Sequence, residues 1–116
     1  MYIKEKNAEF LLDLNKSEII ESINQLSDFG FKVAQNDEMY EFTVGNSVLD
    51  WILKGSIKIE IIDESKTNIK LDSKYVSGTN VQQCAIVKRA KNKLIKKAGD
   101  NKMFNLILSS TNNMIK

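Results

Sequence analysis

The 116-residue chain contains no histidine and no proline, and its single cysteine is Cys84. Without an imidazole, the Ser-His-Asp and Cys-His arrangements of nucleophilic catalysis are excluded, as is a zinc site with histidine ligands. One cysteine excludes an internal disulfide and a thiolate cluster. The five glycines stand singly, so neither a P-loop nor a Gly-x-Gly-x-x-Gly turn occurs. We therefore predict no catalytic residues, no metal site and no cofactor.

Low cysteine content also bears on location, because disulfides are rare in a reducing compartment. Residues 1–7 carry alternating charge and include no apolar run of signal-peptide length. No stretch approaches the roughly 20 apolar residues that cross a bilayer as a helix. We expect a cytoplasmic protein without a membrane span.

The net charge of +2 conceals an uneven distribution along the chain. Residues 1–73 carry 14 acidic and 8 basic side chains, a net charge of −6, whereas residues 74–116 carry 9 basic and one acidic side chain, a net charge of +8. The C-terminal third is therefore the part of the chain that should attract an acidic partner.

Apolar residues recur at every second position in several segments, which is typical of strands with one buried face. The clearest pattern is Ile57, Ile59 and Ile61, with Lys58 and Glu60 between them. The predicted strands are residues 10–14, 31–33, 40–44, 57–61 and 68–73. The polar residues 36–38 predict a hairpin between the second and third of these strands.

Two segments have helical spacing instead. Asn15 can cap the first helix, Glu18 completes a capping box, and Gly30 provides the left-handed residue at which the helix ends. Asn80 can cap a second helix that runs to about Ala98 and precedes Gly99. Its predicted buried stripe consists of Val87, Ala90, Leu94 and Ala98. The tail after Gly99 stays ambiguous, because Met103, Leu106 and Ile107 fit a helical turn and residues 104–108 also fit a strand.

These elements predict one α+β domain over residues 1–116, in which two helices pack on one face of an antiparallel sheet of four to five strands. The structure of the tail, residues 100–116, is left open. Four sequence features lie at or near the ends of these elements: Asn15-Lys16-Ser17-Glu18 at the start of the first helix, Phe29-Gly30-Phe31-Lys32-Val33 at its end, Trp51 before the isoleucine-rich strand, and Ser73-Lys74-Tyr75 before the second helix. In this order the chain resembles small bacterial β-α-β-β-β-α proteins of the TBP-like and helix-grip (START, Bet v 1-like) class. No catalytic motif carries across from that resemblance.

The second predicted helix is rich in cations and contains no acidic residue. At 100° per residue, Lys88, Arg89, Lys93, Lys96 and Lys97 occupy about half of its circumference, opposite the apolar stripe. We predict that this face contacts an acidic protein surface or, without sequence specificity, nucleic-acid phosphates. A single arginine and the lack of interleaved aromatics argue against base-specific contacts. The plain alternative is a solvated helix whose cations suit the C-terminal end of the helix dipole.

Self-association is one version of this hypothesis, because opposite charges on two faces of one molecule favour head-to-tail contact and unpaired strand edges can pair between copies. A different hypothesis follows from the helix-grip resemblance, which implies a small hydrophobic ligand or lipid between helix and sheet. The residues that would line that apolar pocket are Trp51, Phe42, Tyr40, Phe31, Met103 and Met39. The structural alternative is that these side chains fill the core.

Acid–base chemistry has few candidates in this sequence. The carboxylate pairs Asp63-Glu64 and Asp37-Glu38 fall in predicted turns, where solvation keeps both members ionised. Cys84 has only a nearby lysine, Lys88, to lower its pKa, and a small buried apolar role suits it better. We therefore expect a non-enzymatic binding or adaptor domain.

Overall fold

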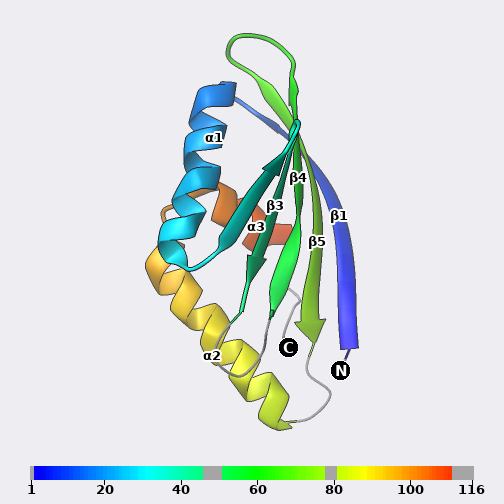
Figure 1. Cartoon of the computed structure of the whole chain (residues 1–116), viewed down its shortest axis with the longest axis vertical. Coiled ribbons are helices and arrows are strands. Elements are labelled where there is room, and N and C mark those ends of the chain that lie inside the picture. The colour runs from blue at the N-terminus through cyan, green and yellow to red at the C-terminus, as the bar shows by residue number, and fades with distance from the viewer. Residues whose placement is uncertain (1, 46–50, 78–80, 111–116) are drawn as a thin grey trace.

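The computed structural model describes residues 2–45, 51–77 and 81–110. Five antiparallel strands form one sheet in the order β1-β5-β4-β3-β2, and the helices cover one face of it (Figure 1). The elements are β1 (Tyr2–Leu12), α1 (Lys16–Gln25), the 3-10 helix η1 (Leu26–Phe29), β2 (Lys32–Asn36), β3 (Met39–Val44), β4 (Leu53–Ile61), β5 (Thr67–Ser77), α2 (Val81–Ala98) and α3 (Lys102–Ser110). The predicted α+β class and its antiparallel sheet are confirmed.

The core lies between the sheet and the helices, as alternation along the strands requires. On β5, Ile69, Leu71, Ser73 and Tyr75 all have no solvent exposure. Cross-strand neighbours share a face, so Leu53 of β4, which pairs with Tyr75, lies on this inner face too. The opposite face of the sheet carries charged side chains and is open to solvent.

α1 begins where the local sequence signal predicts, and the predicted stop at Gly30 falls at the end of η1, because the last turn before it is a 3-10 helix. The side-chain oxygen of Asn15 accepts a hydrogen bond from the Glu18 backbone N–H at 3.0 Å, which satisfies one of the unpaired donors of the first turn. Ile19 and Ile23 turn toward the sheet and are fully buried. The chain leaves η1 at Gly30, whose φ of +97° is a conformation that other residues adopt only with strain.

Two strands are longer than their sequence patterns predict. β1 begins at Tyr2 and pairs with β5 along its whole length, although its first half shows no apolar alternation. β5 continues to Ser77, past the predicted end at Ser73. Within β4, Gly55 is required, because a Cβ at this position would meet the backbone carbonyl of Asp72 and lie 2.9 Å from the Phe42 ring.

The C-terminal tail forms a helix, so the strand alternative for residues 104–108 is wrong. The Asn101 side chain caps α3 by accepting a hydrogen bond from the Phe104 N–H at 2.8 Å, and it donates to the Ser22 carbonyl of α1 at 2.9 Å. Met103 and Ile107 are thereby buried beneath α1 and against the sheet. α3 is a third helix on the inner face, beyond the two predicted. Residues 111–116 of the predicted tail and the predicted cap Asn80 lie outside the described residues.

Candidate functional site

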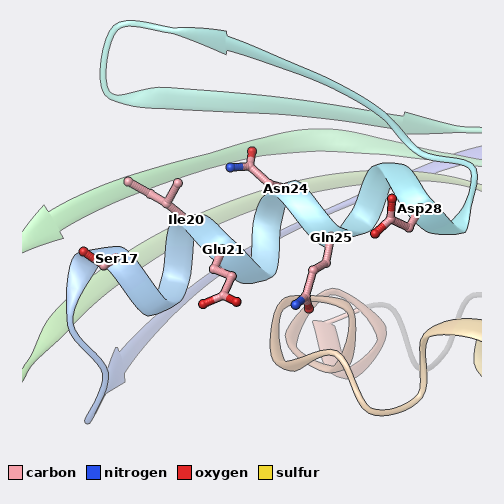
Figure 2. Close-up of a pocket in the computed structure, with 6 residues that line it drawn as sticks. All are labelled: Ser17, Ile20, Glu21, Asn24, Gln25 and Asp28. Atoms are coloured by element: carbon pink, nitrogen blue, oxygen red, sulfur yellow. The ribbon is translucent and has the colours of Figure 1, made fainter.

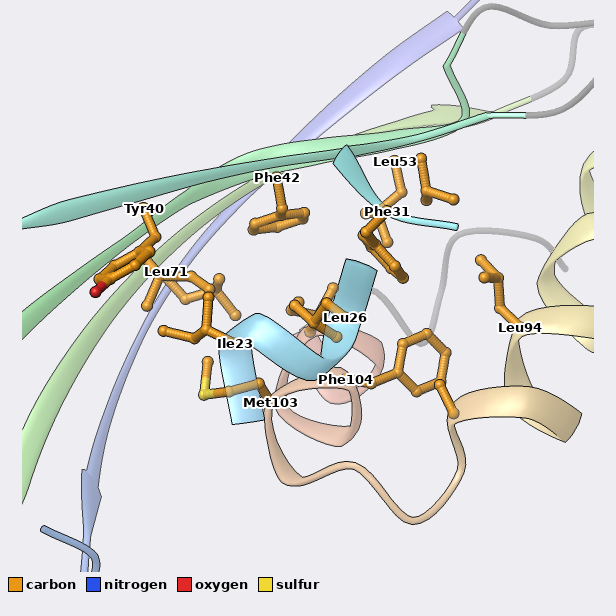
Figure 3. Close-up of a cluster of buried hydrophobic side chains, with 14 of the residues drawn as sticks. Ile23, Leu26, Phe31, Tyr40, Phe42, Leu53, Leu71, Leu94, Met103 and Phe104 are labelled. Atoms are coloured by element: carbon orange, nitrogen blue, oxygen red, sulfur yellow. The ribbon is translucent and has the colours of Figure 1, made fainter. Parts of the chain in front are cut away.

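The residues predicted to line an apolar pocket separate into two environments. Phe31, Tyr40, Phe42 and Met103 are buried in the central cluster shown in Figure 3. There the ring of Phe31 meets Phe42 edge-to-face at 6.1 Å between centroids, and it meets Phe104 of α3 in the same way at 6.2 Å. These aromatic rings pack against one another in the middle of the interior.

Trp51 and Met39 lie elsewhere. Trp51 is half-buried, and the Lys54 ammonium sits 4.3 Å from its ring centroid, a cation–π distance. Because Lys54 follows the buried Leu53 on β4, it belongs to the outer face of the sheet, so part of the indole is turned toward that face. Met39 is 37% exposed at the β2–β3 hairpin. Trp51 therefore lies at the edge of the core, where its fluorescence can respond to changes in packing.

The Tyr75 hydroxyl is the unusual polar atom of the interior. Tyr75 has no solvent exposure, and its hydroxyl has no hydrogen-bond partner among the described residues. An unsatisfied buried hydroxyl costs about 1–3 kcal/mol. In the same cross-strand row, Tyr75 pairs with Lys4 of β1 on one side and with Leu53 of β4 on the other, and Leu53 pairs with Val44 of β3. Leu53 and Val44 are buried and apolar. Tyr75 therefore combines a large apolar surface with one free hydrogen-bonding group.

A second hydroxyl lies two residues away on the same face. Ser73 is fully buried, and its Oγ is 3.5 Å from the Ser110 Oγ at the end of α3. Ser110 in turn donates to the Ile107 carbonyl at 2.8 Å. The inner face around Ser73 and Tyr75 therefore combines apolar side chains with a few polar ones, including Lys6 of β1, which pairs with Ser73. Small-molecule sites often have such a composition.

Two other buried polar side chains of the described residues, Thr67 and Asn101, have hydrogen-bond partners, unlike Tyr75. The Thr67 hydroxyl donates to the Leu14 carbonyl at 2.8 Å. The Asn101 amide makes the two hydrogen bonds described above and a further one to Gln25. Sequence reasoning missed Tyr75 because the predicted strand ended at Ser73. Continued alternation from Ile69 through Ser73 was the available signal for it.

The cations of α2 are exposed together. Lys88, Arg89, Lys93, Lys96 and Lys97 all lie on the solvent side of the helix, whereas Val87, Leu94 and Ala98 are buried on the other side. Within residues 2–45, 51–77 and 81–110, none of these five cations has a carboxylate within ion-pair distance. The ion pair found there joins Lys70 and Glu60 at 3.3 Å, on the sheet. Lys91 is half-buried, at the edge of the apolar side.

Among the described residues, two carboxyl groups have a pKa below its ordinary value. Hydrogen bonds from Lys70 and Asn68 lower the pKa of Glu60, and the backbone N–H and hydroxyl of Ser65 lower the pKa of Asp63. A general acid at neutral pH needs the opposite shift. The described residues include no cluster of three side chains that could hold a metal ion. Among the described helices, none is both long enough and apolar enough to cross a membrane.

Comparisons with known proteins concern the fold. No protein-family model and no curated protein matches the chain. The solved structures that align with it include the Zhui aromatase/cyclase from Streptomyces sp. R1128 (9% identity, 93% of this chain and 93% of that chain, TM-score 0.40), Ara h 8.0201 (10%, 93% and 99%, 0.42) and a conserved protein of unknown function from Enterococcus faecalis (9%, 97% and 86%, 0.41).

Proposed function

We propose that the protein binds a small, mostly apolar molecule that carries one hydrogen-bonding group, in the interior between β5 and the C-terminal helices. The observation that carries this proposal is the fully buried, unpartnered hydroxyl of Tyr75. In an apolar interior, a polar group without a partner lowers stability, and a ligand that supplies the partner recovers that free energy. The aromatic cluster around Phe31 is already filled, so the site lies at the Tyr75 part of the inner face.

This proposal is for binding without chemistry. The neighbours of Tyr75 on β4 and β3 are apolar, Ser73 and Ser110 contribute hydroxyls, and Lys4 and Lys6 of β1 pair with Tyr75 and Ser73. Neither of the two carboxyl groups with a lowered pKa belongs to β5. A hydroxyl in such surroundings orients a ligand and contributes specificity, because a ligand that lacks the matching group leaves it unpaired.

The test uses an uncharged apolar fluorophore with a single N–H group, N-phenyl-1-naphthylamine. Trp51 can report on binding because backbone hydrogen bonds hold it close to Tyr75. The next residue, Ile52, accepts from the N–H of Val76, which follows Tyr75, at 3.0 Å, and it donates its own N–H to the Val44 carbonyl at 2.8 Å. Binding should raise probe emission and quench Trp51. The Tyr75→Phe variant should weaken binding about tenfold, which corresponds to one hydrogen bond of about 1.4 kcal/mol.

The matched control is Tyr40→Phe, which removes a hydroxyl from another buried tyrosine on the same face of the sheet. It should leave probe affinity unchanged. An equal loss of probe affinity in both variants would show that it comes from a general loosening of the core and not from the Tyr75 hydroxyl. No change in Trp51 emission with this probe or with medium-chain fatty acids would contradict the proposal.

A second candidate function is contact with an acidic protein surface through the cationic face of α2, defined as Lys88, Arg89, Lys93, Lys96 and Lys97. The observation in its favour is that these five exposed cations have no carboxylate partner within the described parts of the chain. Retention on immobilised polyglutamate should fall with rising salt and be lost in an Arg89→Glu/Lys96→Glu variant. Tighter, salt-sensitive binding to duplex or single-stranded nucleic acid would contradict this choice of partner.

A further inference from the structure

α1 and η1 carry a surface opposite in charge to the cationic face of α2. A shallow hollow runs along the outside of these helices, and we call it the acidic groove; it is lined by Ser17, Ile20, Glu21, Asn24, Gln25 and Asp28 (Figure 2). Glu21 and Asp28 are exposed, as is Glu18 one turn earlier. Lys16 is the one cation of this helical segment. The groove therefore presents carboxylates and amides around one half-buried isoleucine.

The two surfaces match in spacing as well as in sign. Arg89 and Lys96 are seven residues apart on α2, about 10 Å along the helix axis. Glu21 of α1 and Asp28 of η1 are also seven residues apart, and the larger rise of the 3-10 turn makes their separation about 12 Å. Ile95, 37% exposed, stands beside Lys96 on the solvent side of α2. A helix with this pattern can set Ile95 against Ile20 of the groove and flank that apolar contact with opposite charges.

The arrangement of the helices allows the contact to occur twice. α1 and α2 follow one another along the same flank of the sheet (Figure 1). A two-fold axis beside this flank would place α1 of each copy against α2 of the other, which gives a closed, self-complementary interface. Forming the contact twice is important for stability. A single exposed ion pair contributes little, because fixing two long side chains in one geometry costs conformational entropy.

We propose that the protein forms a two-fold dimer in which the cationic face of one copy docks on the acidic groove of the other. This inference rests on the second candidate function, contact of the cationic face with an acidic protein surface, and it names a second copy of this chain as that surface. Pairing between the β1 edges of two copies is less favourable. Lys6 of β1 lies on the helix side of the sheet next to Ser73, so edge pairing would bury its charge between the two copies.

The experiment measures mass by sedimentation at fixed protein concentration in low and high salt. We expect about twice 13.2 kDa at low salt and 13.2 kDa near 1 M salt, where the screening length is only about 3 Å. Two charge reversals on exposed residues, Glu21→Lys/Asp28→Lys and Arg89→Glu/Lys96→Glu, should each give a monomer at low salt. Mixed in equal amounts, these two variants should restore the dimer, because both contacts again join opposite charges.

The matched control is Lys58→Glu/Lys74→Glu, which reverses two exposed cations on the open face of the sheet and should stay dimeric. A monomeric wild-type protein at low salt would overturn the inference. So would failure of the mixed variants to associate, dissociation of the control, or growth of the wild type beyond a dimer. If the wild type is monomeric yet still binds polyglutamate through Arg89 and Lys96, the second-copy inference fails and the wider proposal of an acidic protein partner stands.

Discussion

Replacing Tyr75 by phenylalanine is the most informative change, because it removes one oxygen and leaves the buried ring. The hydroxyl has no partner among the described residues, and an unsatisfied buried group costs about 1–3 kcal/mol. The unliganded variant should therefore be more stable than the wild type, by about 1–2 kcal/mol after slight relaxation around the ring. For a chain of this length, that gain raises the unfolding midpoint by several degrees.

Urea unfolding followed by Trp51 emission and by circular dichroism measures this difference, with Tyr40→Phe as the reference. The midpoint should rise for the Tyr75 variant at an unchanged slope. A fall of about 1 kcal/mol or more would show that the hydroxyl is hydrogen-bonded in the folded protein, as most buried polar groups are. That result would refute the reasoning, since the proposed ligand site depends on a free hydroxyl.

Three further predictions concern stability. Gly55→Ala should lower the free energy of unfolding by about 1–3 kcal/mol, measured in urea, because the new methyl group collides with the sheet backbone and the Phe42 ring; wild-type stability would contradict the close approach. Asn101→Ala should cost about 1–3 kcal/mol and expose the α3 amides to hydrogen exchange, since it removes the cap and the anchor to α1; unchanged exchange would argue against that anchor. Folding lowers the pKa of Asp63 below its ordinary value of 3.8. Its ionised carboxylate therefore stabilises the folded protein above pH 3.8, and this stabilisation is lost as the pH falls below that value. Asp63→Asn should therefore reduce the loss of stability on acidification below this pH, and an unchanged acid side of the stability–pH curve would contradict the role of the hydrogen bonds from Ser65.

Elements with strong local signals could be predicted from the sequence. The cap at Asn15 and the stop at Gly30 act within a few residues, so α1 and η1 begin and end where the pattern indicates. The tail had no such signal, because its apolar residues fit both periods. Its helix is decided by contacts distant in sequence, above all the Asn101 amide that reaches the Ser22 carbonyl of α1.

The first half of β1 could not be predicted for a related reason. It is an edge strand with lysines and glutamates in place of apolar alternation, and it is ordered by backbone pairing with β5. That pairing extends β5 to Ser77 and buries Tyr75, so the candidate ligand site depends on a strand partner that the local pattern hides. The cationic face of α2 needed only helical periodicity, and its five cations do lie on the exposed side.

Ligand contact at Tyr75 can be observed directly in the protein with carbon-13 in its three tyrosine rings. The Tyr75→Phe variant identifies the Tyr75 resonances by their loss, and N-phenyl-1-naphthylamine is then titrated into the wild type. The Tyr75 ring signals should shift with the same midpoint as the Trp51 emission, while those of Tyr40 stay in place. Unmoved Tyr75 signals at saturating probe would contradict ligand contact at Tyr75.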